Sequence, residues 1–122
     1  ALPVIRLLVK AGADVNAKGR NELTPLHLAV QRYIEHPDKK MSIQIIRFLV
    51  QAGADLNSQD EIGYTVLMTA VVNDRPGLVE LLLALGADRT IKDKSGSGAL
   101  DYAGSLKVSK EVLELLRSEG PD

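Results

Sequence analysis

The tripeptide Gly-Ala-Asp occurs three times in this chain of 122 residues, each time after a run of aliphatic residues. The copies lie at 12–14, 53–55 and 86–88, so their spacings are 41 and 33 residues. Self-similarity at a period of about 20 to 50 residues is the signature of stacked units that bury their apolar faces only against one another. The sequence therefore predicts a repeat solenoid.

Helix-like segments lie on both sides of each copy. Before each glycine, two apolar residues, one charged residue and two further apolar residues place an apolar stripe on one helix face. Glycine ends such a helix because it adopts left-handed backbone angles without a clash. Twelve residues later, Thr24-Pro25, Thr65 or Gly98 opens another apolar segment, and Thr and Pro both favour a helix start. The repeats are therefore predicted to be pairs of helices.

The segment Thr-Pro-Leu-His-Leu-Ala at 24–29 resembles the signature of the ankyrin repeat family. This resemblance implies an all-α solenoid, an ankyrin-repeat stack of helix-turn-helix units with projecting β-hairpin-like loops. It also implies that His27 bonds Thr24 and the loop backbone as a structural signature. Met68 and Asp101 stand at the position of His27 in later copies, so we expect other contacts to hold those loops.

Aligning the repeats predicts one domain over residues 1–122, with four parts. They are the outer helix and loop of a partial repeat (1–23), a repeat with eight extra residues (24–64), a further repeat (65–97) and a C-terminal capping repeat (98–122). The opening helix has no inner helix before it, so Val4, Ile5 and Leu8 are expected to be exposed. Either the chain is truncated there, or another chain covers that face.

The extra residues of the repeat 24–64 are expected to lengthen the surface connection between its helices. Pro37 disfavours helical angles at His36, which predicts a turned or extended segment there. Lengthening a surface loop costs only about 0.6 kcal/mol per doubling, so stability alone tolerates it. The segment 34–41 is therefore either a neutral insertion or a contact site anchored by Tyr33 and Ile34.

Composition excludes several classes of function. Cysteine is absent, which removes disulfides, thiol catalysis and Cys-ligated zinc. The net charge of −1 offers no general attraction to nucleic acid or anionic membrane, and no apolar run approaches the roughly 20 residues of a membrane-spanning helix. His27 and His36 are the only histidines. We therefore predict no enzyme activity, with no catalytic residue, cofactor or metal.

The resemblance implies a protein-binding surface formed by the loop tips and the inner helices. Apolar or aromatic side chains on projecting turns have little folding purpose, and Tyr and Arg are frequent at binding hot spots. The predicted centre is Tyr64 with Ile62, and the alternative is that these side chains pack on neighbouring loops. The predicted partner-binding residues are Arg20, Leu23, Ile62, Tyr64, Val72, Lys92 and Lys94.

The predicted function is a cytoplasmic, monomeric, non-enzymatic protein–protein interaction module or scaffold with a protein partner, and with no nucleic-acid or membrane partner. Two alternatives remain: a structural element that dimerises through its N-terminal half repeat, or an accessory targeting domain of a longer chain. The resemblance also implies that Asn16 and Asn57 could be hydroxylated, although both are equally expected as turn formers.

Overall fold

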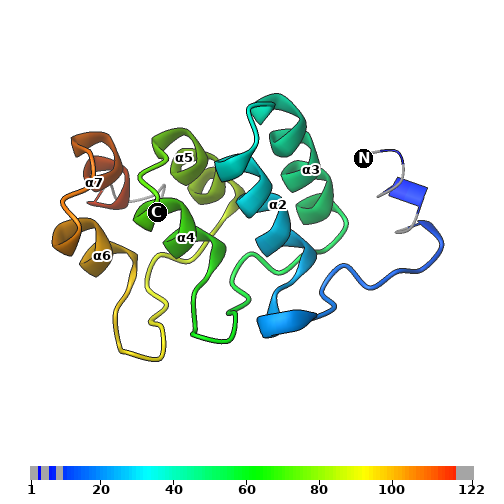
Figure 1. Cartoon of the computed structure of the whole chain (residues 1–122), viewed down its shortest axis with the longest axis horizontal. Coiled ribbons are helices and arrows are strands. Elements are labelled where there is room, and N and C mark those ends of the chain that lie inside the picture. The colour runs from blue at the N-terminus through cyan, green and yellow to red at the C-terminus, as the bar shows by residue number, and fades with distance from the viewer. Residues whose placement is uncertain (1–2, 4–5, 8–9, 118–122) are drawn as a thin grey trace. The chain divides into compact units, whose positions relative to one another are not determined.

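The computed structural model describes residues 3, 6–7 and 10–117. The predicted exposure of Val4, Ile5 and Leu8 lies outside the described residues. In the described part the chain forms six α-helices and one 3₁₀ helix and no strand, as the predicted all-α class requires (Figure 1). Two compact units, Ala1–Asp55 (unit 1) and Leu56–Asp122 (unit 2), are described separately.

Unit 1 contains the 3₁₀ helix η1 (Arg20–Glu22) and the helix pair α2 (Pro25–Glu35) and α3 (Lys39–Gln51). The two α-helices pack against each other along most of their length. Their buried side chains follow the apolar stripes of the sequence, with Val30 and Ile46 fully buried.

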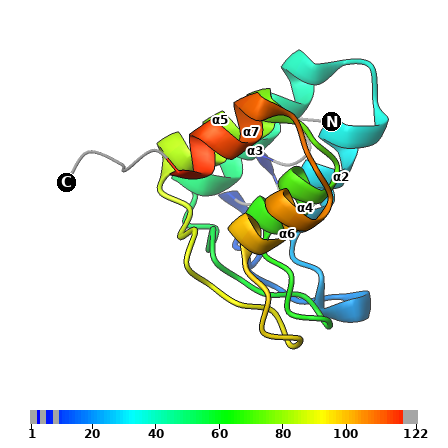
Figure 2. The ribbon, with the colours of Figure 1, turned by 90° about the vertical axis from the view of Figure 1, so that its left-hand side faces the viewer.

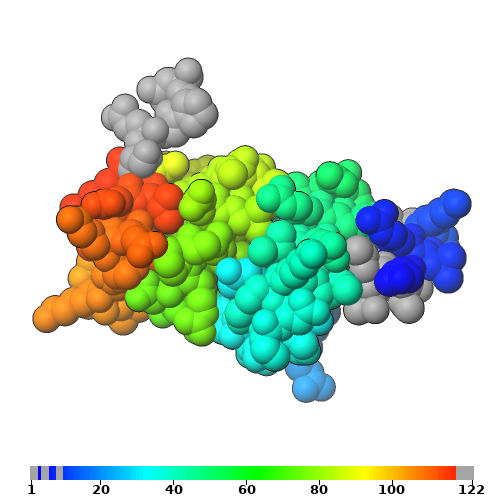
Figure 3. Space-filling model, turned by 90° about the horizontal axis from the view of Figure 1, so that it is seen from above, coloured from blue at the N-terminus to red at the C-terminus, as the bar shows by residue number. Residues whose placement is uncertain are grey.

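Unit 2 contains two helix pairs, α4 (Val66–Val72) with α5 (Pro76–Leu85) and α6 (Ala99–Ser105) with α7 (Lys110–Arg117). Helix α4 also contacts α6, and α5 contacts α7, so an inner and an outer layer form (Figure 2). Seen from the end opposite the loops, the two pairs pack side by side (Figure 3). Ala70 and Ala103 lie fully buried between them, where a small side chain allows close approach.

The helix ends confirm the predicted start and stop residues. Thr24 and Thr65 are N-caps whose hydroxyls accept from the backbone N–H three residues on. Gly86 closes α5 in the left-handed region with φ of 109°, and Gly53 does the same after α3 with φ of 103°.

The expected lengthening of the surface connection in the repeat 24–64 is wrong. Helix α2 has 11 residues where α4 and α6 have 7, and α3 has 13 where α5 has 10. The connections 36–38 and 73–75 have equal length. Seven of the eight extra residues therefore lie in the two helices, about one turn, of about 3.6 residues, in each, and the eighth is Ala52 between α3 and Gly53. His36 is extended as predicted, with φ of −98° and ψ of 139°.

Side-chain contacts hold the lengthened helix pair together. The Arg32 guanidinium donates to the Ser42 hydroxyl at 2.6 Å and to the carbonyl of Asp38 at 3.4 Å. The Lys39 ammonium donates to the carbonyls of Tyr33 and Ile34, where a cation also complements the C-terminal end of the α2 dipole. Tyr33 and Ile34 are half-buried, so little of either predicted anchor is available at the surface. A contact role for the segment 34–41 stays a prediction.

Candidate functional site

Three loop tips share the same two closing hydrogen bonds: loop 1 (19–23), loop 2 (60–64) and loop 3 (93–97). In each, the first N–H donates to the carbonyl of the fifth residue at 2.9 Å. The fourth N–H returns to the carbonyl of the first at 3.0 Å. The predicted hairpin-like loops are therefore five-residue closed turns, and their side chains decide how firmly each is held.

Loop 2 is held by the carboxylate of Asp60. Its Oδ1 accepts from the N–H of Ile62 at 3.0 Å and from the N–H of Tyr64 at 2.9 Å. Gly63 occupies the fourth position with φ of 90°, a conformation that side chains disfavour. Two carboxylate bonds and one glycine thus fix the backbone that carries Ile62 and Tyr64.

Loop 3 is held by Asp93, whose side chain is buried. Its Oδ1 accepts from the N–H groups of Ser95 and Ser97 at 2.9 and 3.0 Å and from the Ser95 hydroxyl at 2.6 Å. Its Oδ2 accepts from the Tyr102 hydroxyl on α6. The donors Ser95 and Tyr102 lower the pKa of Asp93 to about 2. Asp93, followed by the hydroxyl of Tyr64, raises the pKa of Tyr102 to about 12.

Loops 2 and 3 are joined to each other. The N–H of Lys94 donates to the carbonyl of Ile62 at 3.3 Å. The Gln59 amide donates to the carbonyls of Gly63 and Lys92, each at 2.8 Å. The ring centroids of Tyr64 and Tyr102 lie 5.4 Å apart in an edge-to-face arrangement. The two loops therefore form one ordered surface.

This surface surrounds a cleft of about 350 Å³, which we name the tip cleft. Ile62 stands at it with 55% of its surface exposed. Glu61 and Lys94, both exposed, place opposite charges on the two loops. The cleft can therefore offer a partner an apolar contact with a charge of either sign beside it. Its lining residues are Glu61, Ile62, Tyr64, Asp93, Lys94, Ser95 and Tyr102.

The structure brings three predicted partner-binding residues together, namely Ile62, Tyr64 and Lys94. Lys92 lies near them, but its ammonium pairs with the Asp101 carboxylate at 3.3 Å. Val72 ends α4, is half-buried and does not line the cleft.

Two of the predicted exposures are wrong. Leu23 and Tyr64 are half-buried rather than exposed. Tyr64 loses exposure because its ring packs against Tyr102. For Tyr64 the structure thus favours the alternative stated from the sequence, in which the side chain packs within the fold.

Loop 1, in unit 1, carries the other two predicted residues, Arg20 and Leu23. Gly19 stands where loops 2 and 3 have aspartate, so no carboxylate holds this turn from that position. Asn21 and Glu22 adopt left-handed angles with φ of 58° and 57°. Such angles strain residues other than glycine. Arg20 is exposed on this less favourable frame.

The His27 ring bonds Thr24, as the resemblance implied. Its Nδ1 accepts from the N–H of Thr24 at 3.1 Å and lies 2.9 Å from the Thr24 hydroxyl, with both side chains buried. In the last repeat, Asp101 takes over this position and accepts from the N–H of Gly98 at 2.8 Å. The later loops are thus held by carboxylates. This agrees with the expectation that contacts other than those of a histidine hold these loops.

Asn16 and Asn57 connect successive loops within their units. The side-chain carbonyl of Asn16 accepts from the N–H of Asp55 at 2.7 Å, and that of Asn57 from the N–H of Asp88 at 2.8 Å. Both asparagines therefore have a structural role, and their hydroxylation stays a prediction.

Asp60 and Asp93, the residues that order the tip cleft, were not predicted from the sequence. A signal was present, because both aspartates occupy the same repeat position and each precedes a glycine by three residues. For metal binding the described part of the chain offers no group of three or more His, Asp or Glu residues.

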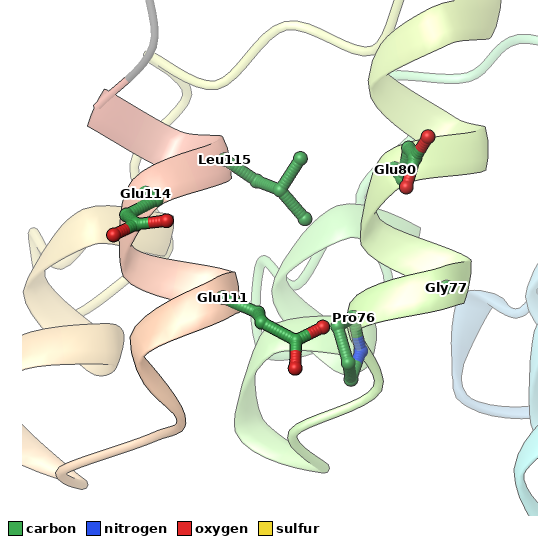
Figure 4. A pocket seen from close by; sticks show the side chains of 6 residues that line it. All are labelled: Pro76, Gly77, Glu80, Glu111, Glu114 and Leu115. Carbon is green, nitrogen blue, oxygen red and sulfur yellow. The ribbon is translucent and has the colours of Figure 1, made fainter.

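A second hollow of about 450 Å³, which we name the outer groove, lies between α5 and α7 of unit 2. Leu115 projects from α7 into the space between the two helices, and Glu111 reaches toward Pro76 (Figure 4). The groove is lined by Pro76, Gly77, Glu80, Glu111, Glu114 and Leu115.

Comparison with protein families agrees with this architecture. A model described as "Ankyrin repeats (many copies)" matches residues 49–103, and one described as "Ankyrin repeat" matches residues 21–61. The chain belongs to the ankyrin repeat family. Repeats of this family are generally non-enzymatic modules for protein–protein interaction. None of the helices in the described ranges is long and apolar enough to cross a membrane.

Proposed function

We propose that this chain is a cytoplasmic protein-binding module, without enzyme activity, whose tip cleft is the centre of partner contact. The observation that carries the proposal is Ile62, which exposes 55% of its surface on a loop held by carboxylate and glycine. An exposed aliphatic side chain contributes little to folding, whereas on a fixed backbone it binds a partner with little ordering cost.

The surroundings of Ile62 suit a protein partner. The rings of Tyr64 and Tyr102 add apolar area beside it, and tyrosine is enriched at interface centres. Lys94 and Glu61 lie at the edge, where charges steer association and select partners more than they add affinity. A nucleic-acid partner would need a coherent basic stripe, and Glu61 and Asp101 interrupt the lysines here.

The remaining predicted residues are proposed as additional partner contacts. Arg20 and Leu23 lie on loop 1 of unit 1, and Lys92 and Val72 lie in unit 2 outside the cleft lining. In unit 1, a hollow of about 400 Å³ along α2 presents Leu28, which is 56% exposed. We assign these residues to the periphery, because no aromatic pair or buried carboxylate fixes them.

Affinity capture from a lysate of the source organism, with mass spectrometry, identifies the partner for a direct binding measurement. Calorimetry then compares the chain with its Ile62→Ala/Tyr64→Ala variant. We expect a loss of about 2 kcal/mol or more, roughly 30-fold in Kd, as for hot-spot residues.

The matched control is Leu106→Ala, because Leu106 is a similarly exposed aliphatic residue, at 52%, outside the tip cleft. This variant should bind with unchanged affinity. Circular dichroism and amide spectra establish that both variants are folded. Equal affinity of the double variant and the parent chain contradicts the proposed site.

A further inference from the structure

The two units carry opposite net charge. Residues 1–55 have eight Lys and Arg against five Asp and Glu, whereas residues 56–122 have seven against eleven. The overall charge of −1 conceals this division into about +3 and −4. Two surfaces on outer helices concentrate the difference.

The positive surface is the outward stripe of α3, which we name the α3 stripe. Its residues are exposed and follow one another at intervals of four, three and four positions, so they share one helix face. Helix α3 contains no Asp or Glu. Neither Lys40 nor Arg47 has an ion-pair partner among the described residues. The stripe consists of Lys40, Gln44, Arg47 and Gln51.

The negative surface is the outer groove. Its floor includes Leu115 and Pro76, both half-buried, and its rim carries Glu80, Glu111 and Glu114. Glu114 pairs with Lys110 at 3.8 Å in an exposed, weak contact. Glu80 and Glu111 have no ion-pair partner in the described part of the chain. The groove is therefore an apolar trough with uncompensated negative charge on both helices.

We propose that the outer groove of one molecule binds the α3 stripe of a second copy, head to tail. Lys40 and Arg47 lie about 10 Å apart along α3, a span of two helix turns, and meet carboxylates contributed by both α5 and α7. The aliphatic stems of Lys40 and Arg47 cover Leu115. Lys40 belongs to the helical turn added to α3, so the eight extra residues help to build this contact.

The contact joins two different surfaces, so a pair of bound copies leaves one groove and one stripe unoccupied. It involves rim charges, so it is weak and sensitive to salt. The association uses the outer layer of unit 2 and does not involve the tip cleft.

Sedimentation equilibrium of the purified chain at high concentration tests this proposal. We expect association in about 0.01 M salt, where the Debye length is roughly 30 Å, and about tenfold weaker association at 0.15 M, where it is about 8 Å. The variants Arg47→Glu and Glu111→Lys should each lose the low-salt association.

A mixture of these two variants provides the decisive arm. The first retains an intact outer groove and the second an intact α3 stripe, so the mixture should associate although neither variant does so alone. Arg20→Glu and Glu35→Lys are controls with the same changes of charge, and both should associate like the parent chain.

Three results would overturn the proposal: a monomer at every concentration in low salt, equal association of the parent chain and both single variants, or no dimer in the mixture. The second of these would indicate self-association through an apolar face. None of these results bears on partner binding at the tip cleft.

Discussion

Loop 1 and the pair formed by loops 2 and 3 have the same closing hydrogen bonds but differ in how those bonds are supported. In loops 2 and 3, Asp60 or Asp93 accepts from two backbone N–H groups, and glycine occupies the left-handed position. In loop 1, Gly19 replaces the aspartate and Glu22 takes the left-handed position.

This difference shows that the same pair of closing hydrogen bonds can be either supported or merely tolerated. The supported loops carry the exposed Ile62 and the ring of Tyr64, which packs against Tyr102 of α6, and this is the arrangement expected of a preorganised contact surface. Loop 1 carries Arg20, and its left-handed residues are not glycine, so its backbone is strained. We therefore place the centre of binding on loops 2 and 3.

The largest expected effect comes from Gly63→Ala. A Cβ there would lie 2.7 Å from the Lys94 nitrogen and 2.9 Å from the Asp93 Cα, and φ is 90°. We expect the free energy of unfolding, measured with urea, to fall by about 3 kcal/mol.

Gly96→Ala is the matched control, because φ is 86° but nothing lies within 4 Å of the added Cβ. It should cost about 1 kcal/mol, from the backbone angle alone. If both glycines prove equally tolerant, the close contact between loops 2 and 3 does not exist.

The next effect concerns the bond between Asp93 and Tyr102. In Asp93→Asn the charge on the acceptor is lost, so the pKa of Tyr102 should fall from about 12 toward 10. A pH titration of tyrosinate absorbance measures this, and Tyr102→Phe identifies the signal. An unchanged titration in Asp93→Asn would show that Asp93 does not hold the ring.

The same bond fixes the direction of two pH effects on stability. The pKa of Asp93 is lowered to about 2, so its contribution is fully present above about pH 4 and is lost as pH falls toward 2. The pKa of Tyr102 is raised to about 12, so its contribution is present below about pH 10 and is lost as pH rises toward 12.

The smallest expected effect is a gain in loop 1. Gly19→Asp with Glu22→Gly gives loop 1 the chemistry of loop 2, and a Cβ at Gly19 meets only the Leu23 carbonyl, at 3.8 Å. Relief of the left-handed angle should raise the free energy of unfolding by about 1 kcal/mol.

The pair Gly19→Asp with Glu22→Ala is the control, because alanine keeps the strained angle and should give at most half of that gain. Equal stability of both variants in urea would mean that Glu22 is not strained.

Local rules predicted much of this fold. Thr24, Thr65 and Gly86 mark helix ends because capping depends on residues adjacent in the chain. The added helix turns were not predicted, because Pro37 and the extra residues equally fit a longer surface connection. The helical spacing of apolar residues continues to Ile34 and resumes from Met41, and Asp38 is the N-cap of α3. These features favour longer helices over a longer connection.

The candidate site was less predictable. The repeat register located Ile62, Tyr64 and Lys94 at loop tips. The burial of Tyr64, however, depends on Tyr102, which is 38 positions away in the sequence. The role of Asp93 likewise depends on a hydroxyl from another element. Such contacts follow from packing between repeats, which the pattern within one repeat does not contain.

Amide hydrogen exchange of the complex with the captured partner tests the central claim most directly. We predict that partner binding slows exchange most at the N–H groups of Ile62, Tyr64, Ser95 and Ser97, which line or support the tip cleft. Slowing confined to α5 and α7, with loops 2 and 3 exchanging as in the unbound chain, would contradict the claim.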